Sequence, residues 1–236
     1  MVSGNARALA RLATEISECR ACPRLVEWRE QVAHEKRASF RDHAYWGRGV
    51  PGFGDPTARI VVIGLAPAAH GANRTGRVFT GDRSGDFLFA SMHRCGLANQ
   101  PTSIARDDGL VLRDAYVAAA VRCAPPANKP TPEERDACRP FLVRELAALS
   151  RPAVLVVLGS FAYDAAWATL AASGVELPRP RAKFGHLMEQ PAGALTVLGS
   201  FHPSQQNTFT GRLTEPMLDA VFERAIAIVR GVSGRA

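Results

Sequence analysis

Four short runs of apolar residues are spaced along the chain. Each consists mostly of Val, Ile, Leu and Ala, and is continuous rather than alternating with polar residues. Strands of a parallel sheet, which helices cover on both faces, have this pattern. We therefore predict buried strands at residues 59–64, 115–121, 153–159 and 195–201.

Apolar residues at helical spacing fill the segments between and around these strands. Residues 131–148 begin with Thr131, which suits an N-cap, and Pro132, which suits the first helical position. Further helices are predicted at residues 6–18, 25–35, 84–95, 160–173 and 215–230.

This alternation predicts an α/β fold with a central, mostly parallel sheet of four strands flanked by helices. Such sheets place ligands beyond the carboxyl ends of their strands. Residues 65–82, 122–130, 160–163 and 202–207 follow the four strands and are where we look for function.

Composition narrows the class of protein. The chain has 236 residues, 47% hydrophobic and 22% charged, which excludes collagen-like, coiled-coil and disordered proteins. No apolar stretch is long enough for a transmembrane helix, and residues 1–21 lack the apolar segment of a signal peptide. We therefore expect a cytoplasmic protein with no membrane partner.

The formal net charge of +7 is compatible with solubility alone. Only three of the 29 basic residues are Lys. Arginine suits bidentate phosphate contacts, although a GC-rich genome would enrich it too. Arg74 and Arg77, in a strand-end segment, are the first candidates for phosphate binding.

Five cysteines in a chain without an export signal favour metal ligation over disulfides. Cys19 and Cys22 form a Cys-x-x-Cys pair, Cys123 ends a strand, and Cys138 lies in the next helix. These four fit zinc, a 4Fe–4S cluster, or simple burial as small apolar residues. Cys95 stands apart, and we expect it in the core.

Residues 47–52 match the spacing G-x-G-x-x-G, but they precede the first strand and contain Pro51. The dinucleotide-binding motif must follow a strand and open a helix, so we reject that interpretation. A loop of this composition permits close backbone approach to a ligand such as a phosphate.

Residues 64–82 form the richest segment. It is a nineteen-residue stretch with several glycines, Asn73, Phe79 and Asp82, and loops of this length are usually functional. Phe79 would suit stacking on a planar ligand. His202, followed by Pro203 and Ser204, lies at the end of the last strand, where active sites of such sheets occur.

Together these residues resemble the uracil-DNA glycosylase superfamily, and most closely its family 5. Residues 64–82 are similar almost throughout to the first motif of that family, and His202-Pro203-Ser204 with Asn207 to its second. The resemblance extends from about Cys19 to Thr214. Families 1 and 4 carry an acidic residue where this chain has Leu65, so family 4-like specificity is an alternative that this position disfavours.

The resemblance implies a single three-layer α/β domain over residues 1–236. Its N-terminal helices (about 5–35) would be tied on by a 4Fe–4S cluster bound to Cys19, Cys22, Cys123 and Cys138. It implies a monomeric, monofunctional DNA N-glycosylase in a bacterium or archaeon. The enzyme would flip uracil, and hypoxanthine or other deaminated or modified bases, out of double-stranded DNA and leave an abasic site.

The resemblance also implies roles for the site residues. Phe79 would stack on the flipped base, while backbone groups near Leu65 and Ala66, together with Asn128, recognise its polar edge. His202 would hydrogen-bond the base oxygen as charge builds there. Asp82 would handle water or stabilise the cationic sugar, with Asp86 as its rival.

Contacts to DNA are expected from residues around this site. Gln205, Gln206 and Asn207 would fill the gap that the extruded base leaves. Backbone contacts would come from Gly49, Pro51, Ser160, Ser204 and the cluster Arg179, Arg181 and Lys183. Two other classes stay open at this point: a non-catalytic iron–sulfur DNA-binding protein and a zinc-stabilised hydrolase.

Overall fold

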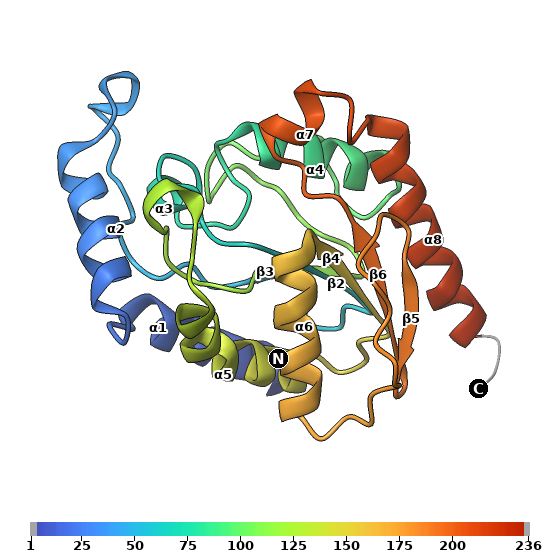
Figure 1. Ribbon diagram of the computed structural model, residues 1–236. Helices are drawn as coiled ribbons and strands as arrows, with labels where there is room; N and C mark the ends of the chain where they lie inside the picture. Colours follow the sequence, from blue (N-terminus) through green and yellow to red (C-terminus); the bar gives the residue numbers. More distant parts are fainter. Residues whose placement is uncertain (1–3, 234–236) are drawn as a thin grey trace.

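The four predicted strands are present and run parallel to one another. In the computed structural model, which describes residues 4–233, they are β2 (Ile60–Gly64), β3 (Ala115–Ala119), β4 (Val154–Leu158) and β6 (Leu195–Ser200). Every residue of β2, β3 and β4 is buried, as expected for strands with helices on both faces. The predicted α/β class is confirmed (Figure 1).

Two short edge strands extend the sheet from the four predicted strands to six, in the order β1-β3-β2-β4-β6-β5. β1 (Phe53–Gly54) and β5 (Glu189–Ala192) each pair antiparallel with their neighbour. β1 is too short to leave a pattern in the sequence. β5 contains Pro191, which lacks the N–H of a central strand and is tolerated at an edge.

Residues of each central strand alternate between two apolar layers. Val62, Val117 and Val156 face a layer that α4 (Arg83–Arg94) and α8 (Glu215–Ser233) cover. Val61 and Val157 face the opposite layer, beneath α5 (Pro132–Ala148) and α6 (Ser160–Ala172). Figure 1 shows this arrangement, with α8 along one side of the sheet and α6 on the other.

All six predicted helices are present, including α1 (Gly4–Glu18) and α2 (Pro23–Glu35). Thr131 caps α5 as predicted, in a reciprocal capping box with Glu134. Shorter turns that carry little periodicity were not predicted: α3 (Ala72–Thr75), α7 (Gln205–Phe209), η1 (Ala38–Phe40) and η2 (Pro126–Asn128). Within residues 4–233, no helix is both long and apolar enough to cross a bilayer.

Direct contacts fasten the two N-terminal helices to the rest of the fold. Glu15 of α1 pairs with Arg144 of α5. Arg24 of α2 forms a two-pronged ion pair with Glu134 and donates to the carbonyl of Lys129. α2 lies beside α3, so the N-terminal helices reach the segment that follows β2 (Figure 1).

Candidate active site

A cavity of about 660 Å³ opens at the carboxyl ends of the parallel strands. Leu65 follows β2, Asn128 lies in the segment after β3, Ser160 follows β4, and His202 follows β6; all four line the cavity. The fold therefore brings together the strand-end segments in which we expected function.

Phe79 forms one wall of the cavity in a conformation that the surrounding glycines permit. Its backbone is left-handed, with φ of +53°, and only 8% of the residue is exposed. A Cβ on Gly64 would lie 2.6 Å from the Phe79 ring, and a Cβ on Gly85 would lie 1.8 Å from its carbonyl oxygen. A non-glycine residue rarely adopts positive φ unless its surroundings hold it there, so the ring is fixed in place.

Asp82 lines the cavity at the start of α4. Its carboxylate caps the helix by accepting a hydrogen bond from the Gly85 backbone N–H at 3.0 Å. Burial raises the pKa of this carboxyl, against the opposing effect of the backbone hydrogen bonds from Gly85 and Ser84. Its rival Asp86 is exposed and is not among the residues that line the cavity.

His202 packs beside Phe79 in the cavity lining, with ring centroids 5.9 Å apart and planes tilted by 34°. Burial lowers the pKa of its imidazole to about 4, so the ring is neutral at physiological pH. The Asn207 side-chain amide donates to the His202 carbonyl at 2.8 Å and holds the segment. A neutral imidazole here presents one N–H donor without a net charge.

The remaining predicted base contacts lie around the same space. Leu65 and Ala66 line the cavity beside Phe79, and the Leu65 carbonyl accepts from the Val121 N–H at 3.1 Å, in continuation of the β2–β3 ladder. Asn128 is exposed on the rim, with Ala127 and Asn128 both in the left-handed region. The turn η2 thus presents a polar amide at the opening of the cavity.

Comparison with known proteins decides the family. Residues 51–226 match the family model described as the uracil DNA glycosylase superfamily. The chain belongs to the uracil-DNA glycosylase superfamily. The resemblance predicted from the motif at residues 64–82 is confirmed.

Within the superfamily, the chain is most similar to type-5 proteins among the relatives compared. It is 53% identical over 226 residues to the type-5 uracil-DNA glycosylase of Mycobacterium tuberculosis, covering 95% of this chain and 83% of the relative. The type-5 uracil-DNA glycosylase of Thermus thermophilus is 51% identical over 211 residues, 89% of this chain and 93% of the relative. The type-4 uracil-DNA glycosylase of Archaeoglobus fulgidus is 29% identical over 191 residues, 80% of this chain and 78% of the relative.

Four of the predicted DNA contacts of this superfamily member lie at the cavity. Ser160, Ser204, Gln205 and Gln206 all line it, and the two glutamines are exposed at its edge. Ser204 also caps α7 by accepting from the Asn207 N–H. α7 therefore holds Gln205 and Gln206 at the rim.

The structure does not place Gly49 and Pro51 where a duplex could touch them. Both residues are buried. A Cβ on Gly49 would lie 2.0 Å from the Ile16 carbonyl oxygen, so glycine here allows close packing against α1. The close approach that we predicted is real, but its partner is a helix rather than a phosphate.

Arg74 and Arg77 are likewise turned inward and are not phosphate contacts. Arg74 donates to the carbonyls of His70 and Gly81, and its guanidinium lies 4.0 Å from the centroid of the Phe40 ring. Asn207 uses its side-chain amide on the His202 carbonyl. Arg74, Arg77 and Asn207 therefore use their polar groups on other parts of the protein next to the site.

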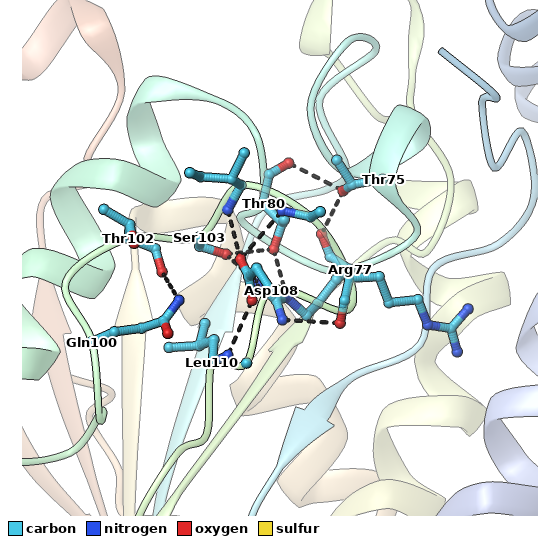
Figure 2. A network of polar contacts seen from close by, with 12 residues as sticks. Thr75, Arg77, Thr80, Gln100, Thr102, Ser103, Asp108 and Leu110 are labelled. Atoms are coloured by element: carbon cyan, nitrogen blue, oxygen red, sulfur yellow. Dashed lines mark hydrogen bonds and ion pairs between the residues drawn. The ribbon is translucent and has the colours of Figure 1, made fainter.

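Arg77 is the centre of a buried network that sequence reasoning missed (Figure 2). Its guanidinium donates to both oxygens of Asp108, to Ser103 Oγ and to Thr80 Oγ1. Asp108 also accepts backbone N–H groups of its own loop. The network fixes Thr80, beside Phe79, to a loop more than twenty residues away, and only the Asp108-Gly109 turn hinted at that loop.

The four predicted cysteine ligands gather on one side of the cavity. Cys19 follows α1, Cys22 caps α2, Cys123 follows β3 and Cys138 lies in α5. Cys22, Cys123 and Cys138 share an apolar cluster that Ala66 and Phe161 join, and both of these also line the cavity.

The thiols influence one another's titration. Burial raises the pKa of Cys123, and that of Cys138 to about 12, and the negative charges of neighbouring cysteines contribute. Among residues 4–233, no three His, Cys, Asp or Glu side chains form a group that could hold a metal ion. Cys95 stands apart, against the α4–α8 core with its Sγ donating to the Asp219 carbonyl.

Proposed function

We propose that this chain is a uracil-DNA glycosylase of type 5, which hydrolyses the N-glycosidic bond of uracil in DNA and leaves an abasic site. The observation that carries the proposal is the convergence of Phe79, Asp82 and His202 on one cavity. The sequence of the chain is also 53% and 51% identical to those of two proteins named for this activity.

The cavity suits a base that has left the duplex. The rigid Phe79 ring offers a face for stacking, and Leu65 and Ala66 supply apolar wall. Asn128 at the rim can donate to and accept from the edge of a pyrimidine. Since Leu65 and Ala66 bring no polar side chain against the base, we propose that hypoxanthine and other deaminated bases are also accepted.

The polar groups of the cavity suit the charges that develop during the reaction. As the glycosidic bond breaks, negative charge moves onto the leaving base, and the sugar becomes an oxocarbenium-like cation. The neutral His202 imidazole donates a hydrogen bond to the base oxygen, a donor of the kind whose loss costs about 3 kcal/mol in other enzymes. The Asp82 carboxylate stabilises the cationic sugar or positions the attacking water.

The partner we propose is double-stranded DNA, bound by a monomer in the cytoplasm. Ser160 and Ser204 would contact the backbone, while Gln205 and Gln206 enter the space that the flipped base leaves. Raising salt should weaken duplex binding, because phosphate contacts release counterions.

We propose further that Cys19, Cys22, Cys123 and Cys138 hold a 4Fe–4S cluster. A single zinc ion would need each thiolate within about 2.3 Å, whereas four irons, each with its own thiolate, leave the sulfurs farther apart. Cys22, Cys123 and Cys138 share one apolar cluster, and Cys19 acts electrostatically on Cys22 and Cys123, which supports a site shared by all four. The buried Arg29 guanidinium, whose Nε has no partner in the described chain, points at Cys123 Sγ, as a group facing an anionic centre would.

When bound, the cluster would supply a link between the N-terminal helices and the sheet, with no part in the hydrolysis. Residues from about 5 to 35 would then form one domain with the rest of the chain. Anaerobically purified protein should be brown and contain about four irons per chain. Colourless protein with stoichiometric zinc would disprove the cluster without touching the proposed activity.

The activity is tested with an end-labelled duplex that contains one G:U pair. Incubation followed by alkali should cut the labelled strand at the uracil, while a G:C duplex stays intact. His202→Ala should bind the duplex but release uracil much more slowly. A duplex with hypoxanthine tests the wider substrate range in the same experiment. Binding with no cleavage at enzyme excess would overturn the proposal and leave a non-catalytic DNA-binding protein.

A further inference from the structure

Arg29 of α2 carries a guanidinium buried among the proposed cluster ligands. The residue is 1% exposed. Its Nη1 donates to Cys123 Sγ at 2.8 Å, and its Nη2 donates to the Cys19 carbonyl at 2.9 Å. One side chain therefore contacts the segments of two of the four cysteines.

No carboxylate in residues 4–233 forms an ion pair with this guanidinium. Its chain neighbour Glu30 is half exposed and pairs with Arg20 instead. Two other buried arginines have carboxylate partners: Arg122 pairs with Glu145, and Arg77 with Asp108. The buried Arg74 instead donates to the carbonyls of His70 and Gly81 and lies over the Phe40 ring. A buried charge without a close counter-charge is destabilising, and Arg29 donates to a cysteine sulfur, so negative charge at that sulfur would stabilise it.

The cysteine site would provide that negative charge. Four thiolates around a cluster core of charge +2 leave a net charge of about −2, and such charge needs compensation when it is buried. We propose that Arg29 is a positioning residue for the cluster: its charge offsets that of the cluster, and its hydrogen bond to Cys123 Sγ raises the cluster's reduction potential. This inference rests on the cluster assignment made under the proposed function.

The backbone of Arg29 is fixed at the same time. The Asn73 side-chain amide, fully buried in the segment after β2, donates to the Arg29 carbonyl at 3.1 Å. This hydrogen bond ties the α2 backbone at Arg29 to the segment that leads to Phe79. Hydrogen bonds to cluster sulfurs and nearby positive charge favour the more negative, reduced state, which gives the direction of the effect.

The test compares the intact protein with Arg29→Met and Arg29→Lys, purified anaerobically with their clusters. Arg20→Met is the matched control, because it removes one positive charge from the segment between Cys19 and Cys22 at an exposed position. Two quantities are measured: the midpoint potential of the cluster, and the half-life of its absorbance near 400 nm in the presence of an iron chelator.

We expect a lower potential in Arg29→Met, with a roughly tenfold smaller ratio of reduced to oxidised cluster at a fixed applied potential, or about 59 mV for one electron. Its half-life in chelator should fall about tenfold. Arg29→Lys keeps the charge but loses the two-pronged donor. Its midpoint potential and its half-life in chelator should both lie between those of Arg29→Met and the unmodified protein.

A potential of Arg29→Met no lower than that of Arg20→Met would overturn the inference, even if the half-life fell, because loosened packing alone shortens retention. If Arg29→Met retains no cluster, the potential of Arg29→Lys decides in the same way. An unmodified protein that binds no iron would instead refute the cluster assignment, which is a separate and visible outcome.

Discussion

The Phe79 ring lies directly against the backbone of Gly64, at the carboxyl end of β2. A Cβ at position 64 would come within 2.6 Å of two ring carbons. The glycine that ends the strand is therefore what lets the stacking face of the proposed base pocket occupy its place. The position of the Phe79 ring therefore depends on the absence of a Cβ at residue 64.

Gly64→Ala should displace the Phe79 ring and slow uracil excision about 100-fold, since a misplacement of about 1 Å in a catalytic site costs this much. Overpacking should also lower the free energy of unfolding by about 1–3 kcal/mol. Single-turnover excision and urea denaturation measure the two effects. Gly185→Ala is the control, because the nearest atom to a Cβ there is 4.0 Å away.

Asp82→Asn should lower the excision rate at least about 100-fold, within the range for loss of an acid–base group, while duplex affinity persists. Asparagine is as good an N-cap as aspartate, so α4 should stay intact. Asp86→Asn, at an exposed position outside the cavity, should stay within about threefold of the unmodified rate. The reverse order of the two variants would assign the water to Asp86.

The raised pKa of Asp82 adds a pH dependence. Burial keeps the carboxyl protonated to a higher pH than an exposed aspartate. If the ionised form acts, the excision rate should fall with decreasing pH above the usual range for aspartate, and Asp82→Asn should abolish that dependence.

His202 should make stability depend on pH in a defined window. Its pKa is about 4 when folded and near 6.5 when unfolded, so below pH 6.5 the unfolded state binds the additional proton. The neutral His202 therefore contributes its full stabilisation of the folded state above pH 6.5, and this stabilisation is lost as the pH falls toward 4. Between pH 7 and 5, the free energy of unfolding of the unmodified protein should fall by about 2 kcal/mol more than that of His202→Asn. Equal losses in both proteins would contradict a neutral His202 in the folded state.

The Arg77–Asp108 pair should be needed for both stability and catalysis. Arg77→Met leaves a largely buried carboxylate without its partner and should cost about 3 kcal/mol of unfolding free energy. Excision should slow as Thr80 and Phe79 lose their support. Arg224→Met breaks an exposed pair with Glu189 and should cost under about 1 kcal/mol. Similar losses in the two variants would show that the buried network contributes no more than a surface pair.

Phe209 should strengthen binding to DNA beside the cavity. Its side chain is 67% exposed at the end of α7, the helix that carries Gln205 and Gln206. The guanidinium of Arg83, which lines the cavity, lies 5.3 Å from its ring. Phe209→Ala should weaken duplex affinity about tenfold, as loss of one stacked base contact does. Val111→Ala, also exposed, is the control in the same binding titration.

The sequence by itself determined the central strands, the six long helices and the segments that form the cavity. Each of these elements could be predicted from its own residues, because an apolar run or a helical spacing reflects which faces of that one element are buried. The motif at residues 64–82 also placed Leu65, Phe79 and Asp82 after β2. Since parallel strands end at one edge of a sheet, a local pattern was sufficient to predict that His202 joins them.

Only the tertiary structure decided which polar and glycine residues serve the site and which serve the fold. Gly49 permits contact with α1, Arg77 meets Asp108, and Arg29 lies at Cys123 without a carboxylate. Each of these relations joins residues about thirty or more positions apart. Pairing at that distance depends on how layers and loops pack, and it leaves no periodic trace in the chain from which it could be predicted.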